Sequence, residues 1–269
     1  MTPVRLGAVG YLNARPLVYG LDALPRFHVR YDVPSECARL LHENAIDLGL
    51  IPSIEYLRGG PYRIVPDVAI VSNGPVASVA LYTTKPIEDV RSVAMDTSSR
   101  TSVALTQVLC TRHFKIAPAV VHVGPDLTEM LARCDAALII GDIALLLDHR
   151  TLQLRDQKAQ VRKIDLGEVW QSLTGLPFVY AFWAGRPGAV TAEDVEALQR
   201  ARDAGRTQSE QIAQQYFAGT PAHREIGARY LRDNIQYHLG KPEREGLEAF
   251  YRYAAEAGVV ESAGRLELY

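Results

Sequence analysis

Two short loops of this chain combine amide, hydroxyl and guanidinium groups in patterns that suit a bound anion. The first is Gly-Tyr-Leu-Asn-Ala-Arg-Pro-Leu, residues 10–17, which directly follows a strand-like run. A chain that leaves a strand at Gly10 and starts a helix near Pro16 presents unpaired backbone N–H groups, and a helix N-terminus attracts negative charge. Asn13 can cap this helix or reach a ligand, because its amide both donates and accepts hydrogen bonds. The residues alone leave both roles open.

The second loop is Asp-Thr-Ser-Ser-Arg-Thr-Ser, residues 96–102, which opens a helix-like stretch. It gathers five hydroxyls and one guanidinium within a helical turn and its approach. Arginine binds a carboxylate through two parallel hydrogen bonds, and the N-terminal amides add fixed dipoles. The glycines and the GK[ST] signature of a P-loop are missing, and a solvated serine-rich cap is the alternative. We expect a carboxylate to be bound by Ser98, Ser99, Arg100, Thr101 and Ser102.

Two further positions could bring a reactive group into a cleft. Ser78 follows the turn at 73–75 and starts a strand, so its side chain is free to face a cleft. The GxSxG elbow and partnered His/Asp spacing are missing, so a nucleophilic role for Ser78 is unsupported. Gly141 breaks a strand and places Asp142 at a helix start. Asp142 is either an N-cap or a cleft acid that binds or titrates.

Large aromatic residues near the end of the α/β region have a plainer interpretation. Trp170 has helical spacing with Leu166 and Leu173, which favours a place in the core. Tyr180 and Trp183 lie on one strand and could line a cleft, although core packing is the better interpretation of both.

Composition argues against several classes of partner and cofactor. The chain of 269 residues carries 29 Lys and Arg against 31 Asp and Glu, so no basic surplus supports nucleic-acid binding. Its cysteines form no CxxC pair and its seven histidines form no HxxxH pair, so the sequence proposes neither a disulfide framework nor a metal site. We expect no metal and no cofactor. An anionic ligand needs local donors, because the net charge is -2.

The chain also lacks the patterns of export and membrane insertion. The N-terminus enters a strand-like run without a basic head, an apolar core and a cleavage site. The longest uncharged stretch, between Asp67 and Lys85, is divided by Asn73-Gly74-Pro75 and is too short to span a bilayer. We expect a cytoplasmic protein without membrane contact, and the sequence leaves its oligomeric state open.

Alternation of strands and helices predicts α/β layers with largely parallel sheets. The expected strands are 4–9, 28–33, 48–51, 68–72, 79–83, 92–95, 119–123, 136–140 and 179–184. The expected helices are 35–43, 101–114, one long helix from Thr191 towards Tyr216, one from Thr220, and one from Lys241 to Gly258.

Joints at Thr83–Pro86 and Ala184–Gly188 flank a self-contained strand–helix set. We therefore expect two lobes, one built from residues 1–85 and 186–269 and the other from 86–185, which close by a hinge around a ligand. The alternative is one continuous sheet with ordinary loops.

Six sequence blocks in order, from Val4 to about Trp183, carry a family resemblance. They are residues 10–17, Ile-Pro-Ser-Ile-Glu-Tyr (51–56), Ser-Asn-Gly-Pro-Val-Ala-Ser-Val (72–79), Ser-Ser-Arg-Thr-Ser (98–102), Ile-Gly-Asp-Ile-Ala-Leu (140–145) and Trp-Gln-Ser-Leu-Thr-Gly-Leu-Pro-Phe-Val-Tyr (170–180). Together they resemble the chorismate dehydratases of the futalosine route to menaquinone. The resemblance implies a type II periplasmic-binding-protein-like α/β fold, with a ligand cleft between its lobes, used here as an enzyme.

The resemblance also implies a hydro-lyase reaction and roles for single residues. Such an enzyme removes water from chorismate, a small anionic substrate, and gives 3-[(1-carboxyvinyl)oxy]benzoate. Asn13 and Ser78 match family residues near the chemistry, and the base is either Asp142 or the substrate's own enolpyruvyl carboxylate. The expected substrate-binding set is Ser53, Ser98, Ser99, Arg100, Thr101, Ser102, Gly141 and Tyr180. The alternatives are 1,4-dihydroxy-6-naphthoate synthase of the same pathway and a non-catalytic small-anion binding protein of the same fold.

Overall fold

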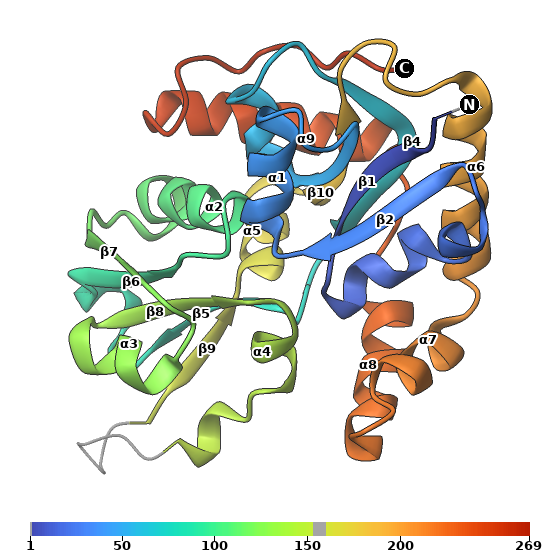
Figure 1. Ribbon diagram of the computed structural model, residues 1–269. Coiled ribbons are helices and arrows are strands. Elements are labelled where there is room, and N and C mark those ends of the chain that lie inside the picture. The colour runs from blue at the N-terminus through green and yellow to red at the C-terminus, as the bar shows by residue number, and fades with distance from the viewer. Residues whose placement is uncertain (1, 153–159) are drawn as a thin grey trace.

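Two five-stranded mixed sheets form the framework of the computed structural model, which describes residues 2–152 and 160–269 (Figure 1). We call the part built on each sheet the first and the second lobe. The first sheet has the order β2 (Phe27–Asp32), β1 (Val4–Val9), β3 (Leu48–Pro52), β10 (Phe178–Gly185) and β4 (Arg63–Ser72). The second has the order β7 (Ala119–Val123), β6 (Ser92–Asp96), β8 (Ala136–Ile140), β5 (Val79–Thr83) and β9 (Arg162–Asp165).

Helices cover both sheets and connect them (Figure 1). The α-helices are α1 (Pro34–His42), α2 (Thr101–Leu109), α3 (Leu127–Arg133), α4 (Gly141–Leu146), α5 (Leu166–Thr174), α6 (Ala192–Gly205), α7 (Ser209–Tyr216), α8 (Arg224–Asp233) and α9 (Lys241–Glu256). A π-helical turn, Cys110–Phe114, extends α2. Short 3-10 helices span Leu12–Val18, Leu21–Ala23, Ser53–Leu57, Ile87–Asp89, His149–Thr151 and Pro221–His223. In the ranges that the structure describes, no helix is both long and apolar enough to cross a membrane.

The sheets are less parallel than the sequence predicts. β1 runs parallel to β2 and β3, and β6 runs parallel to β7 and β8. The strands next to the crossings run the other way: β10 is antiparallel to β3 and β4, and β5 is antiparallel to β8 and β9. Each of these strands enters its sheet from the other lobe, so it need not follow the direction that successive βα units impose.

Sheet membership also differs from the expected lobe limits. β5 ends at Thr83 but pairs within the second sheet, and β10 ends at Gly185 but pairs within the first. The chain therefore changes sheet between β4 and β5 and again between β9 and β10, one strand earlier than the expected joints. Strand pairing, rather than the Pro and Gly content of a loop, fixes these two crossings. Closure of the lobes about them stays a prediction.

The helix expected from Thr191 has its start signal but not its expected length. Thr191 accepts a hydrogen bond from the backbone of Asp194, whose carboxylate accepts one from the Thr191 N–H, as a capping box requires. The single long helix expected towards Tyr216 is wrong, because α6 ends at Gly205 and α7 starts at Ser209. Gly205 packs so closely on the backbone of Pro16 that a β-carbon would lie 2.2 Å from its carbonyl oxygen.

Candidate active site

A small cavity of about 60 Å³ collects most of the residues that the sequence indicates for ligand binding. It lies beyond the carboxyl ends of β1, β3 and β8, where open α/β sheets bind their ligands. The expected residues in its lining are Asn13, Ser78, Ser99, Arg100, Thr101, Ser102, Gly141 and Tyr180. Ser53, Ser98 and Asp142 lie outside this lining. Both lobes contribute to the wall, so a bound molecule would contact both.

Asn13 lines the cavity and does not cap a helix. It is the second residue of the 3-10 helix Leu12–Val18, whose N-cap is Tyr11, and no side-chain cap hydrogen bond forms there. Its Oδ1 is buried and accepts no hydrogen bond from any residue that the structure describes. A buried acceptor without a donor costs about 1–3 kcal/mol. A ligand that offers a donor to Asn13 would remove this cost.

Ser78 follows a tight turn that is held from the second lobe. Ala77 has a φ of 63°, and the Ser78 N–H donates to the carbonyl of Val76 at 2.7 Å. This three-residue turn is of the rare and strained kind. Asp165 holds it, because its carboxylate accepts the N–H groups of Val76 and Ala77 at 3.0 and 2.6 Å. Lys163 donates to the carbonyl of Ala77 at 2.8 Å. Contacts from the second lobe thus fix the backbone that precedes Ser78.

Tyr230 is the immediate neighbour of the Ser78 hydroxyl. The two oxygens are 2.6 Å apart, and Ser78 and Tyr230 are only 1% and 2% exposed. Burial raises the pKa of Tyr230, and the nearby side chains of Ser78 and Asn13 partly offset this increase. Sequence reasoning missed Tyr230, because a tyrosine on an amphipathic helix carries no signal of what it contacts.

Thr101 joins the two lobes at the start of α2. Its Oγ1 accepts the N–H of Ile54 at 3.2 Å and lies 3.4 Å from the hydroxyl of Ser53. Ser53 itself is fully buried and donates to the carbonyl of Val179 at 2.8 Å. Ser53 therefore supports Thr101 from behind rather than facing the cavity.

Arg100 and Ser98, on the same loop, have different surroundings. Arg100 is exposed at the cavity wall, and its guanidinium forms no ion pair with any described residue. Ser98 donates its N–H and its hydroxyl to one oxygen of Asp96 at 2.8 and 2.7 Å. Asp96 is 1% exposed, and burial raises its pKa against these hydrogen bonds. Ser98 thus uses its N–H and its hydroxyl within the loop, as donors to Asp96.

Asp142 connects the lobes instead of facing the cavity. It lies in the first turn of α4, with one oxygen accepting the Leu12 N–H at 3.2 Å and the other accepting the hydroxyl of Tyr216 at 2.5 Å. Burial raises the pKa of Asp142, and these hydrogen bonds lower it. Its neighbour Gly141 has a φ of 65°, and a β-carbon there would lie 2.9 Å from the ring of Tyr11. Asp142 does not cap α4, because the N-cap of this helix is Ile140.

The aromatic residues divide between core and cavity. Trp170 and Trp183 are fully buried, and Trp170 packs its ring edge-on against Phe178. Tyr180 lines the cavity with 8% of its surface exposed, and its hydroxyl lies 3.1 Å from that of Ser72. The core interpretation is therefore confirmed for the two tryptophans. Tyr180 packs in the core and also lines the cavity.

Comparisons with known proteins match most of the chain. The model of a family described as menaquinone biosynthesis matches residues 4–256. A protein of Thermus thermophilus named chorismate dehydratase is 33% identical over 270 residues, which covers 93% of this chain and 94% of the relative.

Solved structures of lower identity share the fold. A crystal structure of protein AF1704 from Archaeoglobus fulgidus has a TM-score of 0.76 at 16% identity and covers 96% of this chain and 98% of its own. The periplasmic aliphatic sulphonate binding protein SsuA of Escherichia coli has a TM-score of 0.64 at 16% identity and covers 98% and 95%. The fold is thus that of the type II periplasmic binding proteins, and the chain belongs to the chorismate dehydratase family of menaquinone biosynthesis.

Proposed function

We propose that this chain removes water from chorismate to give 3-[(1-carboxyvinyl)oxy]benzoate, in the cytoplasm and on the futalosine route to menaquinone. The observation that carries the proposal is its similarity, over 93% of its length, to a chorismate dehydratase. The cavity supports it, since its polar lining groups come from both lobes and suit a small molecule with two carboxylates.

The reaction needs a proton and a hydroxide to leave neighbouring ring carbons. The ring carboxylate acidifies the proton on the carbon that bears the enolpyruvyl ether, through the intervening double bond. Loss of this proton and of the adjacent hydroxyl makes an aromatic ring, so much of the driving force lies in the substrate. The protein then has to position the substrate, neutralise its carboxylates and assist the departing oxygen.

The lining residues divide naturally between these tasks. Ser99, Arg100, Thr101 and Ser102 surround the start of α2, where hydroxyls, backbone N–H groups and a guanidinium without a described acidic partner can bind one carboxylate. Asn13 and Ser78 lie elsewhere on the wall. On this proposal they contact the reacting edge of the ring, with Ser78 placed by its strained turn.

The geometry favours the substrate's enolpyruvyl carboxylate over Asp142 as the base. Both oxygens of Asp142 already accept hydrogen bonds, from Leu12 and Tyr216, and the residue lies outside the cavity lining. A raised pKa alone does not make a general base, because the base must reach the proton that it removes. The enolpyruvyl group is attached to the carbon that loses its proton, so its carboxylate is within reach.

One mixing experiment tests the proposal. Purified protein is incubated with chorismate, and ultraviolet absorbance and product mass are followed with excess chelator present. We expect loss of chorismate with formation of a product lighter by one water, and full activity in the chelator. A protein that binds chorismate but leaves it unchanged would instead be a binding protein of this fold. Failure to act on chorismate, with turnover of the later naphthoate precursor, would indicate the sibling synthase.

A further inference from the structure

The hydroxyl of Tyr230 lies outside the cavity lining and contacts a side chain of the cavity wall. Tyr230 belongs to α8, and its Oη is 2.6 Å from the Oγ of Ser78. Ser78 lines the cavity, whereas Tyr230 does not. Tyr230 would therefore act on a substrate through Ser78.

Acidity sets the direction of the hydrogen bond between Ser78 and Tyr230, because the geometry allows either hydroxyl to donate. A phenol is a stronger acid than a serine hydroxyl, so Tyr230 is the better donor of the pair. Burial raises the pKa of Tyr230, which keeps this proton in place at neutral pH.

We propose that Tyr230 is a positioning residue that occupies a lone pair of the Ser78 oxygen and thereby turns the Ser78 O–H towards the hydroxyl that leaves the substrate. The inference rests on the proposed dehydration and deepens it. The C–H electron pair becomes a ring double bond, and the C–O pair leaves with the oxygen. The proton taken by the base ends in the water formed, so no co-reactant is needed. Ser78 keeps its proton and stabilises the departing oxygen by a hydrogen bond.

The test compares two buried tyrosines that differ in their contacts. Tyr230→Phe removes the hydroxyl that contacts Ser78 and keeps the ring. Tyr237→Phe is the matched control, because Tyr237 is 3% exposed and its hydroxyl has no hydrogen-bond partner in the described part of the chain. With chorismate as the probe, we expect Tyr230→Phe to lower kcat about 10- to 100-fold with KM within about twofold. Tyr237→Phe should keep wild-type kcat.

A double-mutant comparison separates positioning from structural support. Each tyrosine is also changed in a Ser78→Ala background, with product mass followed over long incubations. If Tyr230 acts through Ser78, Tyr230→Phe should change the residual rate by less than about twofold there. An equal loss in both backgrounds, or an unchanged kcat in the single variant, would overturn the inference. Should Tyr230→Phe fail to fold, a fluorinated tyrosine at position 230 keeps the hydroxyl but makes it more acidic. Its kcat should then fall at a lower pH than that of wild type, because the proton donated to Ser78 is lost earlier, and identical pH profiles of kcat would again overturn the inference.

The wild-type protein distinguishes this inference from the proposed function on which it rests. An active wild-type enzyme with an unaffected Tyr230→Phe variant would overturn the role of Tyr230 and leave the dehydratase activity intact. A wild-type protein that leaves chorismate unchanged would overturn both.

Discussion

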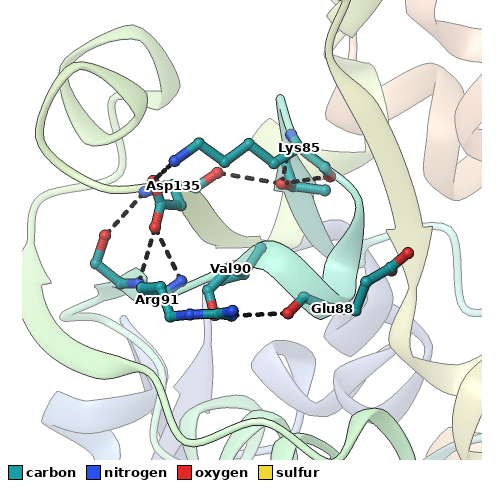
Figure 2. A network of polar contacts seen from close by, with 7 residues as sticks. Lys85, Glu88, Val90, Arg91 and Asp135 are labelled. Carbon is teal, nitrogen blue, oxygen red and sulfur yellow. Dashed lines mark hydrogen bonds and ion pairs between the residues drawn. The ribbon is translucent and has the colours of Figure 1, made fainter.

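The strand β8 has an acidic residue near each end, and the two carboxylates differ in the charge and the lobe of their partners. Asp135 precedes its amino end and is bound within the second lobe, as Figure 2 shows. One oxygen lies 2.6 Å from the ammonium of Lys85, and the other accepts the N–H groups of Arg91 and Ser92 at 2.9 and 3.2 Å. The hydrogen-bonded Lys85 lowers the pKa of Asp135. A charged carboxylate is therefore stabilised at this end.

Asp142 follows the carboxyl end of β8 and has neutral partners from the other lobe. It accepts hydrogen bonds from the backbone of Leu12 and from the hydroxyl of Tyr216. Burial raises its pKa, so its charged form is disfavoured where that of Asp135 is favoured.

The difference shows where this fold satisfies its own polar groups and where it leaves them for other partners. At the amino end of β8, Asp135 pairs with donors of its own lobe, which stabilises that lobe. At the carboxyl end, Asp142 reaches across to the first lobe, and the Oδ1 of Asn13 lacks a partner among the described residues. Changes at the first end should therefore affect stability, and changes at the second should affect activity.

The largest effect is expected from Asn13→Ala at the carboxyl-end cavity. The variant should lose kcat by about 100-fold or more, because an amide that acts on the reacting edge is removed, while measurable chorismate binding remains. Its free energy of unfolding should change by less than about 1 kcal/mol, since the Oδ1 of Asn13 is unsatisfied in the free protein. Steady-state kinetics and urea unfolding check the two parts. A wild-type kcat would contradict the assignment of Asn13.

A smaller effect on activity is expected from Thr101→Ala. The variant should raise KM more than it lowers kcat, with a total loss of about 1–3 kcal/mol in kcat/KM, because a buried donor to the substrate carboxylate is lost. The Ile54 N–H also loses its acceptor, which weakens contact between the lobes. Thr101→Ser is the control, since it keeps the hydroxyl and should keep KM. A wild-type KM for Thr101→Ala would remove Thr101 from the binding set.

Local sequence patterns were sufficient for most strands but not for contacts between distant segments. The runs 4–9, 79–83 and 136–140 form strands with the expected bounds, because β-branched and apolar residues there leave little choice. β9 was missed, since Arg-Lys-Ile-Asp has no apolar run and pairs with β5 alone.

The candidate site was only partly predictable for the same reason. Loop composition identified most of the cavity wall, because helix starts and turns are local features. The partner of Asp142 lies 130 residues away at Leu12, and that of Ser78 lies 152 residues away at Tyr230. No local pattern encodes contacts at such separations. Asp165 has the sequence signal of an N-cap, and it does cap α5. Its contact with the turn before Ser78 depends on tertiary structure, so no local pattern indicates it.

At the amino end of β8, Asp135→Asn should lower stability without lowering activity. The neutral amide can no longer form an ion pair with Lys85. Its NH2 group, which is a donor, would face the N–H donors of Arg91 and Ser92. We expect a loss of about 1–2 kcal/mol in the free energy of unfolding and an unchanged kcat/KM. Lys85→Met should lose less, because Lys85 is half exposed and exposed ion pairs contribute little. Reduced activity of folded Asp135→Asn protein would break the proposed separation between the two ends.

The smallest expected effect is a difference in pH dependence between the two acids. The lowered pKa of Asp135 means that its stabilisation is present above the unfolded-state value of about 3.9 and is lost as the pH falls through the lowered folded value. The raised pKa of Asp142 gives the opposite sign. Its ionisation weakens the folded state as the pH rises from about 3.9 through the raised value.

Urea unfolding of wild-type, Asp135→Asn and Asp142→Asn proteins over pH 3 to 7 separates these contributions. As the pH falls below about 4, wild type should lose its advantage over Asp135→Asn. Over the range just above about 4, wild type should instead gain stability relative to Asp142→Asn as the pH falls, because the buried carboxylate takes up a proton. The amide variants fix a constant offset, so the pH slope of each difference reports one acid. Two slopes of the same sign would show that the ends of β8 do not differ in the way their contacts indicate.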